Sequence, residues 1–205
     1  MKVLIACEES QTVTKEFRKL GHEAYSCDLQ ECSGGHPEWH IQTDVRNILS
    51  EHWDVIIAHP VCRYIANSGV QWLYRDIDRW VKMYQGCEFF NLFLDHPCEL
   101  IAIENPIPHK YSLGYLRRKY DQIIQPWQFG HKKMKATCFW LKGLPKLVPT
   151  NIVGPPPKDK EERKKWADCH RMPPGPEREK LRSKTYRGIA QAMAEQWGCI
   201  EVVAA

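Results

Sequence analysis

The run Val-Ile-Ile-Ala at residues 55–58, followed by His-Pro-Val-Cys-Arg at residues 59–63, constrains the fold most. Four apolar residues in succession, three of them β-branched, predict a central strand covered on both faces. Pro60 cannot donate a hydrogen bond to a sheet, so the strand should end there. Cys62 then follows the carboxyl end of a buried strand, where open α/β sheets bind ligands. It is a candidate nucleophile, and a thiol that only fills space is the alternative.

Further strands are predicted at residues 2–6, 23–27, 40–43 and 100–103. Thr12 or Thr14 would cap a helix that Gly21 ends, and a second, short helix is predicted around residues 45–49. A long helix is predicted from six apolar residues at helical spacing: Ile77, Trp80, Val81, Tyr84, Cys87 and Leu94. The alternation of strands and helices predicts an α/β fold with a doubly wound, mostly parallel sheet.

The later part of the chain is less regular. Residues 123–129 and 136–141 predict an antiparallel hairpin at the sheet edge. Residues 149–181 are rich in proline and charge and predict an insertion into one domain formed by residues 1–148 and 182–205. A last helix is predicted at residues 188–197, where Ile189, Ala192, Met193 and Gln196 share a face.

Composition bounds the function. The 205 residues are enough for one domain with a real core. No segment resembles an export signal or a membrane span, and the nine cysteines form no paired framework, which favours reduced thiols in a cytoplasm. Residues 131–187 hold 16 Lys and Arg against 6 Asp and Glu, although the whole chain carries only +4. This basic segment favours a polyanionic partner such as nucleic acid, with a solvated surface as the alternative.

Each predicted strand ends in a polar or reactive side chain: Cys7-Glu-Glu-Ser-Gln-Thr12, Asp28, Asp44, Cys62 and Glu104. An acid after the second strand can accept hydrogen bonds from a ribose, and one after the third can accept them from an adenine amino group. Each Asp is equally well explained as a cap or turn residue, but together they favour an adenosine-containing cofactor. The absence of GxGxxG and of a P-loop disfavours NAD, FAD and nucleoside triphosphates, which leaves S-adenosylmethionine.

These residues resemble a known family. Pro60-Val-Cys62 and Glu104-Asn-Pro106 are similar to the Pro-Cys and Glu-Asn-Val motifs of cytosine-5 DNA methyltransferases, in the same order along the chain. The basic stretch at residues 129–140 resembles a later family motif, and Ser183-Lys-Thr-Tyr-Arg-Gly-Ile-Ala190 resembles the final one, whose helix packs beside the first strand. The resemblance spans nearly the whole chain and is greatest to small phage and prophage members.

The resemblance implies a mechanism with four catalytic residues. The Cys62 thiolate would attack carbon 6 of cytosine and activate carbon 5 for methylation. Glu104, at least partly protonated, would hydrogen-bond ring nitrogen 3, and Asn105 would position the cysteine loop. Lys133 or, by preference, Lys135 would take the place of family arginines.

The resemblance also implies two binding surfaces. The residues predicted to bind S-adenosylmethionine are Ala6, Cys7, Glu8, Ser10, Gln11, Thr12, Asp28, Leu29, Asp44, His59, Pro60, Ser183 and Thr185. Those predicted to bind DNA are Arg63, Lys132, Lys133, Lys164, Lys165 and Arg171. The expected substrate is duplex DNA with a flipped target base, with single-stranded DNA as the alternative. Only residues 149–181 remain for target recognition, so sequence specificity should be low or short-range.

Three other interpretations stay open. A structural zinc site would use Cys27, Cys32, His36 and His40, joined by Cys169 and His170, although the spacing is not that of a standard finger. An enzyme that modifies carbon 5 of free pyrimidine nucleotides would use the same cysteine attack. A catalytically silent nucleic-acid-binding module would keep the fold and could stack bases on Trp166.

Overall fold

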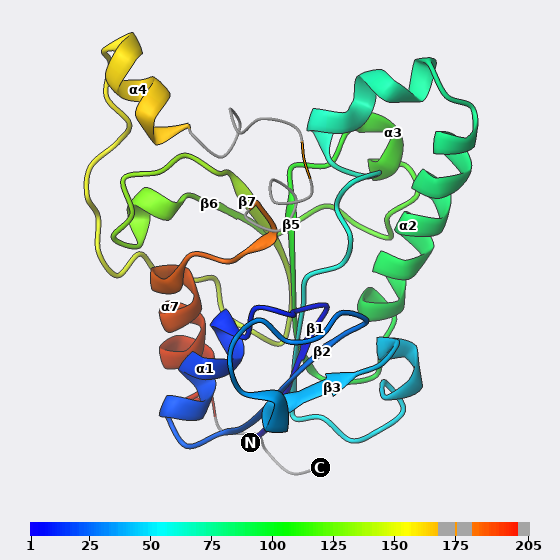
Figure 1. Ribbon diagram of the computed structural model, residues 1–205, viewed down its shortest axis with the longest axis vertical. Coiled ribbons are helices and arrows are strands. Elements are labelled where there is room, and N and C mark those ends of the chain that lie inside the picture. Colours follow the sequence, from blue (N-terminus) through cyan, green and yellow to red (C-terminus); the bar gives the residue numbers. More distant parts are fainter. Residues whose placement is uncertain (168–174, 176–181, 201–205) are drawn as a thin grey trace.

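The computed structural model describes residues 1–167, 175 and 182–200. Its centre is a seven-stranded sheet in the order β3-β2-β1-β4-β5-β7-β6 (Figure 1). The strands are β1 (Lys2–Ala6), β2 (Glu23–Asp28), β3 (His40–Gln42), β4 (Val55–Ala58), β5 (Leu100–Pro106), β6 (Gln122–Ile124) and β7 (Thr137–Lys142). The first five strands pair in parallel, whereas β7 is antiparallel to both β5 and β6. The predicted α/β fold class is confirmed.

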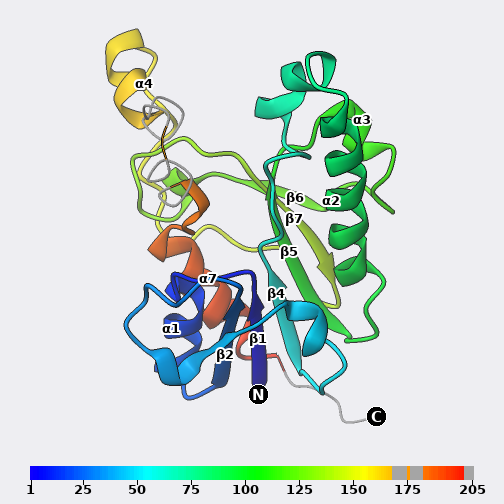
Figure 2. The same cartoon turned by 45° about the vertical axis from the view of Figure 1, so that its right-hand side comes forward.

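Helices cover both faces of the sheet (Figures 1 and 2). One face carries α1 (Thr12–Lys19) and α7 (Arg187–Trp197), whose apolar side chains join those of β1 and β4 in one core cluster. The other carries α2 (Asp78–Leu94) and α3 (Lys110–Leu113) over a second cluster. The remaining helical elements are η1 (Pro37–Trp39), η2 (Val45–Asn47), η3 (Asn67–Tyr74), η4 (Pro126–Gln128) and α4 (Lys160–Trp166). The sheet is therefore doubly wound, as predicted.

The central strands explain why both faces need cover. Alternate residues of a strand point to opposite faces. In β4, Val55 and Ile57 enter the α1–α7 cluster while Ile56 and Ala58 enter the α2 cluster, and all four are fully buried. The continuous apolar run of this strand is thus the signature of a position buried on both sides.

The start of α1 differs from the prediction that Thr12 or Thr14 caps it. Gln11 occupies the N-cap position in a left-handed conformation (φ 54°) and makes no side-chain cap. The buried carboxylate of Glu8 caps the helix instead, because its two oxygens accept hydrogen bonds from the backbone N–H groups of Val13 and Thr14 at 2.7 and 3.2 Å. The helix ends before Gly21, whose φ of 82° fits the predicted stop.

The buried face of α2 is also partly mispredicted. Ile77 precedes the helix and is 80% exposed, and Val81 and Tyr84 are exposed too. The stripe that contacts the sheet consists of Met83, Cys87, Phe90 and Phe93. Apolar residues lie on more than one side of this helix, so spacing alone does not select the face. The predicted helix around residues 45–49 is the short 3-10 helix η2.

The predicted edge hairpin is present with a longer connection. Strand β6 ends at Ile124 because Pro126 starts η4, so the segment predicted at residues 123–129 is mostly not strand. Strand β7 lies close to its predicted position. Among the described residues, no helix combines the length and apolarity that a membrane crossing requires.

Candidate active site

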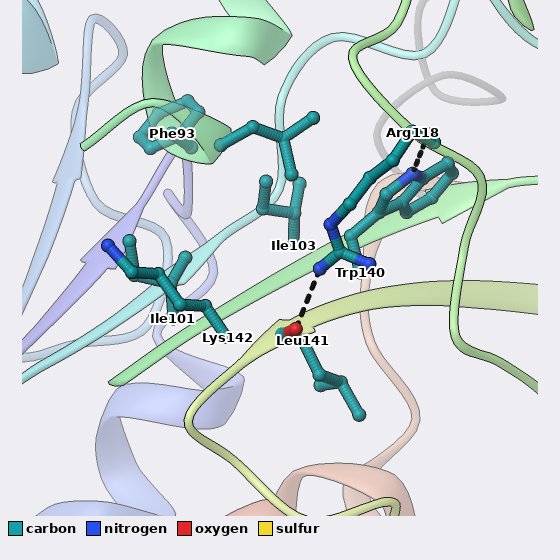
Figure 3. A pocket seen from close by; sticks show the side chains of 8 residues that line it. Phe93, Ile101, Ile103, Arg118, Trp140, Leu141 and Lys142 are labelled. Carbon is teal, nitrogen blue, oxygen red and sulfur yellow. Dashed lines mark hydrogen bonds between the residues drawn. The ribbon is translucent and has the colours of Figure 1, made fainter. Parts of the chain in front are cut away.

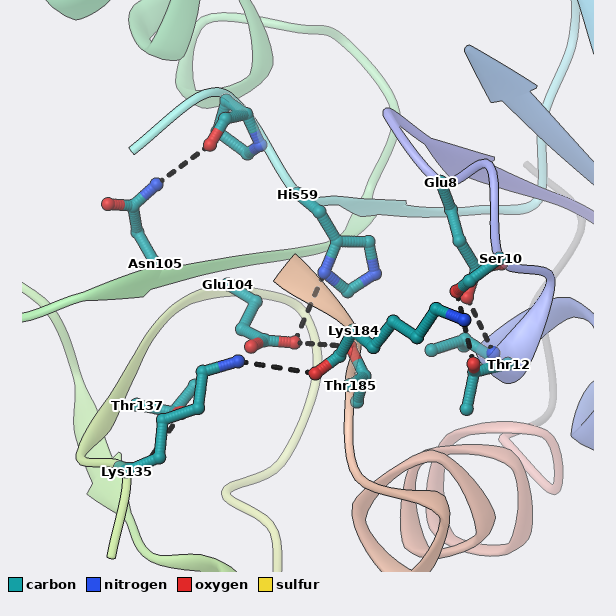
Figure 4. A network of polar contacts seen from close by, with 12 residues as sticks. Glu8, Ser10, Thr12, His59, Glu104, Asn105, Lys135, Thr137, Lys184 and Thr185 are labelled. Atoms are coloured by element: carbon teal, nitrogen blue, oxygen red, sulfur yellow. Dashed lines mark hydrogen bonds and ion pairs between the residues drawn. The ribbon is translucent and has the colours of Figure 1, made fainter. Parts of the chain in front are cut away.

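The register of β4 and β5 brings two of the sequence motifs together. Ala58 lies opposite Ile103, so the next residues of each strand, His59 and Glu104, are neighbours. Their side chains form an ion pair, with 3.1 Å between Nδ1 of His59 and Oε2 of Glu104 (Figure 4). The carboxyl ends of two adjacent strands therefore supply the centre of the site, as the α/β architecture predicts.

Asn105 joins β5 to the loop that carries Cys62. Its Nδ2 donates a hydrogen bond to the backbone oxygen of Pro60 at 3.0 Å (Figure 4). Asn105 is 1% exposed and Pro60 is buried, so this bond is shielded from water. A buried hydrogen bond between two strand ends fixes their relative position.

The cysteine loop is braced further along. The backbone oxygen of Cys62 accepts hydrogen bonds from the N–H groups of Ile65 and Ala66 at 3.1 and 2.9 Å. The N–H of His109, beyond β5, donates to the oxygen of Ile65, and its ring bonds the oxygen of Tyr64. Cys62 itself is half-buried. The cysteine thus sits on an ordered turn, and its side chain retains access to solvent.

Glu104 is held by three segments of the chain. Besides His59, the hydroxyl of Thr185 donates to the same oxygen, Oε2, at 3.0 Å. Burial raises the pKa of Glu104, but the hydrogen bond and charge of His59, with the charge of Lys135, outweigh burial and lower it. Burial lowers the pKa of His59, but the hydrogen bond and charge of Glu104 outweigh burial, so the pKa is raised overall. Both shifts favour an imidazolium beside a carboxylate, whereas the resemblance implies a partly protonated Glu104.

Lys135 connects the edge hairpin to the C-terminal segment. Its Nζ donates to the backbone oxygens of Arg182 and Lys184 at 2.7 and 3.2 Å (Figure 4). This contact places the ammonium near enough to Glu104 to lower the pKa of that carboxyl. The segment before α7 is thereby fixed across the ends of β4 and β5, with the buried Thr185 facing Glu104.

The first loop, at residues 7–12, lies beside this centre. Besides the capping role of Glu8, the buried Gln11 exchanges hydrogen bonds with the backbone of His36. The hydroxyls of Ser10 and Thr12 bond each other at 3.0 Å and stay partly exposed. Figure 4 shows the Lys184 side chain extending toward Glu8 and Ser10. Of these four side chains, all predicted to bind a cofactor, Glu8 and Gln11 have structural roles, and Ser10 and Thr12 remain accessible.

The acids after β2 and β3 converge on the end of β1. Burial raises the pKa of the Cys7 thiol, and the charges of Asp28 and Asp44 raise it further, which places both carboxylates near Cys7. Asp28 caps a turn through the N–H of Gln30, and Asp44 caps η2 and pairs with Arg46. Ala6 is buried and Leu29 is 70% exposed. Ser183 is exposed on the segment before α7.

The predicted DNA-binding residues occupy two places. Lys164 and Lys165 lie on α4, which is tied to the chain by a hydrogen bond from the N–H of Met134 to the oxygen of Trp166. The exposed Lys132 and the half-buried Lys133 lie between β6 and β7. Arg63 is exposed beside Cys62. Arg171 lies outside the described residues.

Sequence reasoning missed a second basic surface, which we call the η3 surface. The guanidinium of Arg75 lies 5.2 Å from the ring centre of Trp72, and that of Arg79 lies 5.0 Å from Tyr64. The ammonium of Lys110 lies 4.9 Å from the ring centre of Tyr111. The net charge of the first 130 residues hides this cluster, since Asp76 and Asp78 in the same stretch and acids elsewhere balance it. Aromatic residues that alternate with arginine directly after Cys62 were the signal available in the sequence.

Two cavities lie away from the strand ends. One of about 270 Å³ opens between α2, β5 and β7 and is lined by Phe93, Leu94, Ile101, Ile103, Arg118, Trp140, Leu141 and Lys142 (Figure 3). The other, of about 450 Å³, lies beside the end of α1 and is lined by Lys15, Arg18, Lys19, Gly21, His22, His36 and Trp39. Neither contains a residue of the His59–Glu104 centre.

Three of the four residues considered first for zinc, Cys27, His36 and His40, have other partners. The Cys27 thiol donates to the backbone oxygen of Thr43, His36 stacks on Trp39, and Nδ1 of His40 bonds Ser26. In the part of the chain that the structure describes, no three His, Cys, Asp or Glu side chains gather as metal ligands. Cys169 and His170 lie outside that part.

Comparison with known proteins gives structural neighbours only. No family model and no curated protein matches the sequence. One solved structure with a similar fold is described as a DNA modification methyltransferase encoded within an E. coli prophage, at 13% identity and a TM-score of 0.48. Another is the Entamoeba histolytica methyltransferase EhMeth, at 15% identity and a TM-score of 0.48. Each alignment covers 74% of this chain but only 52% and 57% of the neighbours, so the chain spans about half their length.

Proposed function

We propose that this chain is an S-adenosylmethionine-dependent DNA methyltransferase that methylates carbon 5 of cytosine through a covalent adduct with Cys62. The observation that carries the proposal is the buried hydrogen bond from Asn105 to Pro60 at the ends of β4 and β5. It brings the loop of Cys62 next to Glu104, and it does so through the two motifs that resemble those of the cytosine-5 family.

The chemistry needs these groups close together. Carbon 5 of cytosine is a weak nucleophile, and attack of the Cys62 thiolate on carbon 6 makes it enamine-like. Negative charge then develops on ring nitrogen 3, where Glu104 stabilises it through a proton or hydrogen bond. Lys135 holds the C-terminal segment against the carboxylate through the backbone of residues 182 and 184. Asn105 holds Pro60, two residues before the nucleophile, against the strand that carries the acid.

The first loop fits S-adenosylmethionine better than a phosphate-bearing cofactor. The N-terminus of a helix is a ready anion site, but at α1 the carboxylate of Glu8 already occupies it. A pyrophosphate would meet that charge, and a sulfonium cation would be attracted by it. Asp28, Asp44 and the hydroxyls of Ser10 and Thr12 would hold the adenosine and amino-acid parts. When bound there, the cofactor supplies the electrophilic methyl group.

DNA would lie across the strand ends between α4 and the η3 surface. Figures 1 and 2 show α4 and η3 on opposite sides of the carboxyl end of β5. Lysines of α4 and stacked arginines of the η3 surface supply phosphate contacts, and the aromatic rings supply stacking. Residues 149–181 form a reduced target-recognition region in this proposal, and the site acts on a base flipped out of the duplex.

One observation favours a second candidate, a carbon-5 modifying enzyme for uracil-type pyrimidine nucleotides. An ionised Glu104 is a hydrogen-bond acceptor only. Uracil presents an N–H at ring nitrogen 3, whereas neutral cytosine presents a lone pair. Cysteine attack on carbon 6 serves both rings, so the charge on Glu104 distinguishes the two candidates.

Covalent trapping tests the proposal. DNA in which 5-fluorocytosine replaces part of the cytosine is incubated with the protein and S-adenosylmethionine, then separated on a denaturing gel. Fluorine cannot leave carbon 5 as a cation, so the adduct with Cys62 should persist as a slow band. Cys62→Ala should abolish the band, and Cys32→Ala, at another half-buried cysteine, should not. A band that forms with 5-fluorouracil nucleotides but never with the DNA would support the second candidate instead.

A further inference from the structure

The sequence motifs imply only a cofactor contact for His59, yet its ring pairs with Glu104 at the centre of the site. Its Nδ1 is 3.1 Å from Oε2 of Glu104, and its side chain is 13% exposed. Its Nε2 is buried and has no hydrogen-bond partner among the described residues. Figure 4 shows that Nε2 faces the side of Glu8 and Lys184, opposite to Glu104. The ring thus stands between the proposed cofactor side and the proposed base side.

The partners of Glu104 both donate hydrogen bonds to it, an arrangement that favours the ionised carboxylate. Both donors, His59 Nδ1 and Thr185 Oγ1, meet the same oxygen, Oε2, and the Glu104 side chain keeps one tenth of its surface exposed. A carboxylate in this arrangement can accept a hydrogen bond from a base but cannot donate one to cytosine nitrogen 3. Of these two donors only the His59 imidazolium is acidic enough to give its proton to Glu104, because an alcohol hydroxyl such as that of Thr185 keeps its proton.

We propose that His59 is a positioning residue that stores the proton with which Glu104 serves cytosine. This inference rests on the proposed cytosine chemistry. As the Cys62 sulfur bonds to carbon 6, the ring electrons shift toward nitrogen 3. The proton moves from Nδ1 of His59 to Oε2 of Glu104, and the carboxylic acid so formed turns this O–H to nitrogen 3 and gives it the proton, which leaves a neutral imidazole. The reverse transfer restores the ion pair when the thiolate leaves, so the pair neither gains nor loses a proton over a turnover.

The charged groups around His59 favour this role. Glu104 on β5 and Glu8 in the first loop stabilise the imidazolium, and Lys135 between β6 and β7 opposes it. Lys184 extends toward Glu8 from the segment before α7. The two carboxylates prevail, and the pKa of His59 lies above its ordinary value despite burial. The stored proton is thus held to a higher pH than on an ordinary histidine and is lost as the pH rises through the raised pKa.

The test compares pH profiles of single-turnover DNA methylation for wild type, His59→Gln and His52→Gln. His52 is the matched control, since it makes an equal 3.1 Å pair with Asp54 but is 84% exposed and lies before β4. We expect the wild-type rate to fall on the alkaline side. In His59→Gln this fall should move to lower pH, with at least a ~10-fold loss at pH 8. His52→Gln should follow wild type.

A second variant guards against misfolding. His59→Ala leaves a space for imidazole, and free imidazole should restore part of the lost rate on the alkaline side. Superimposable profiles of His59→Gln and wild type, or no effect of imidazole on an active His59→Ala, would overturn the role of His59 while leaving cytosine methylation intact. A wild-type protein that forms no 5-methylcytosine at any pH would instead overturn the proposed function and this inference with it.

Discussion

The first loop and the ends of β4 and β5 are adjacent, yet they use buried polar side chains in opposite ways. In the first loop, Glu8 caps α1 and Gln11 bonds the backbone of His36, so their polar groups are satisfied within the fold. At the strand ends, Nε2 of His59 and Oδ1 of Asn105 are buried without a partner in the described part of the chain. Leaving a buried polar atom unpaired costs about 1–3 kcal/mol. The contrast is what we expect if the strand ends, and not the first loop, form the centre of the proposed site.

Asn105 has one polar atom with a partner and one without. Its Nδ2 is used by the fold, through Pro60, while Oδ1 is left without a partner. The third such atom in the described chain is Nε of Arg79, on the η3 surface. Unpaired buried atoms therefore mark the same regions that the proposed chemistry and DNA contacts require. Substitutions in the first loop should therefore mainly lower stability, and substitutions at the ends of β4 and β5 should mainly lower activity.

The largest expected effect is on activity, from Glu104→Gln. The amide keeps the size of the side chain but cannot take the proton from His59, and removal of one such stabilising group typically costs about 10²- to 10³-fold in rate. Single-turnover methylation measures the loss, and thermal unfolding checks that the fold is kept. Glu99→Gln, at an exposed position directly before β5, is the control. Equal rates for both variants would remove Glu104 from the mechanism.

A smaller effect, on stability, is expected from Glu8→Gln. The change removes the charge at the N-terminus of α1 and at least one of three hydrogen bonds, which should cost about 1–2 kcal/mol in the free energy of unfolding. Urea denaturation measures it. Glu161→Gln, at the exposed N-terminal turn of α4, should change stability by less than about 0.5 kcal/mol. A stable Glu8→Gln that loses only cofactor affinity would assign Glu8 to the ligand.

The smallest effect is expected on DNA affinity. Replacing Arg75 and Lys110 together by alanine should weaken binding several-fold and lower the dependence of affinity on salt by about one unit per lost phosphate contact. Replacing Lys164 and Lys165 together by alanine should weaken DNA binding and lower its salt dependence to a similar extent. Fluorescence anisotropy across a salt series measures both, with Lys19 on α1 and Arg46 on η2, both exposed, as the control pair. Unchanged salt dependence for the first pair would exclude the η3 surface.

The sequence predicts the frame of this molecule because its strongest signals are local. The run at residues 55–58 specifies a strand buried on both faces, and Pro60 specifies its end. Gly21 terminates α1 where a left-handed conformation is required. The edge hairpin follows from two apolar runs separated by turn residues, although Pro126 shortens the first.

The errors arise where contacts between distant residues decide. The buried face of α2 depends on how the helix meets the sheet, since its apolar residues point to several sides. The cap of α1 comes from Glu8, which reaches the helix only because Cys7 and Gln11 adopt positive φ angles. The lowered pKa of Glu104, which no local pattern indicates, depends on His59, 45 residues away, and this pairing requires the register of β4 and β5.

The measurement that tests the central claim most directly uses unmethylated duplex DNA and S-adenosylmethionine with a tritiated methyl group. Nucleoside mass spectrometry then identifies the product for wild type and Cys62→Ser. The account predicts label in 5-methylcytosine for wild type and none for Cys62→Ser. Label that persists in the DNA of the Cys62→Ser reaction, on an amino group of a base, would contradict it.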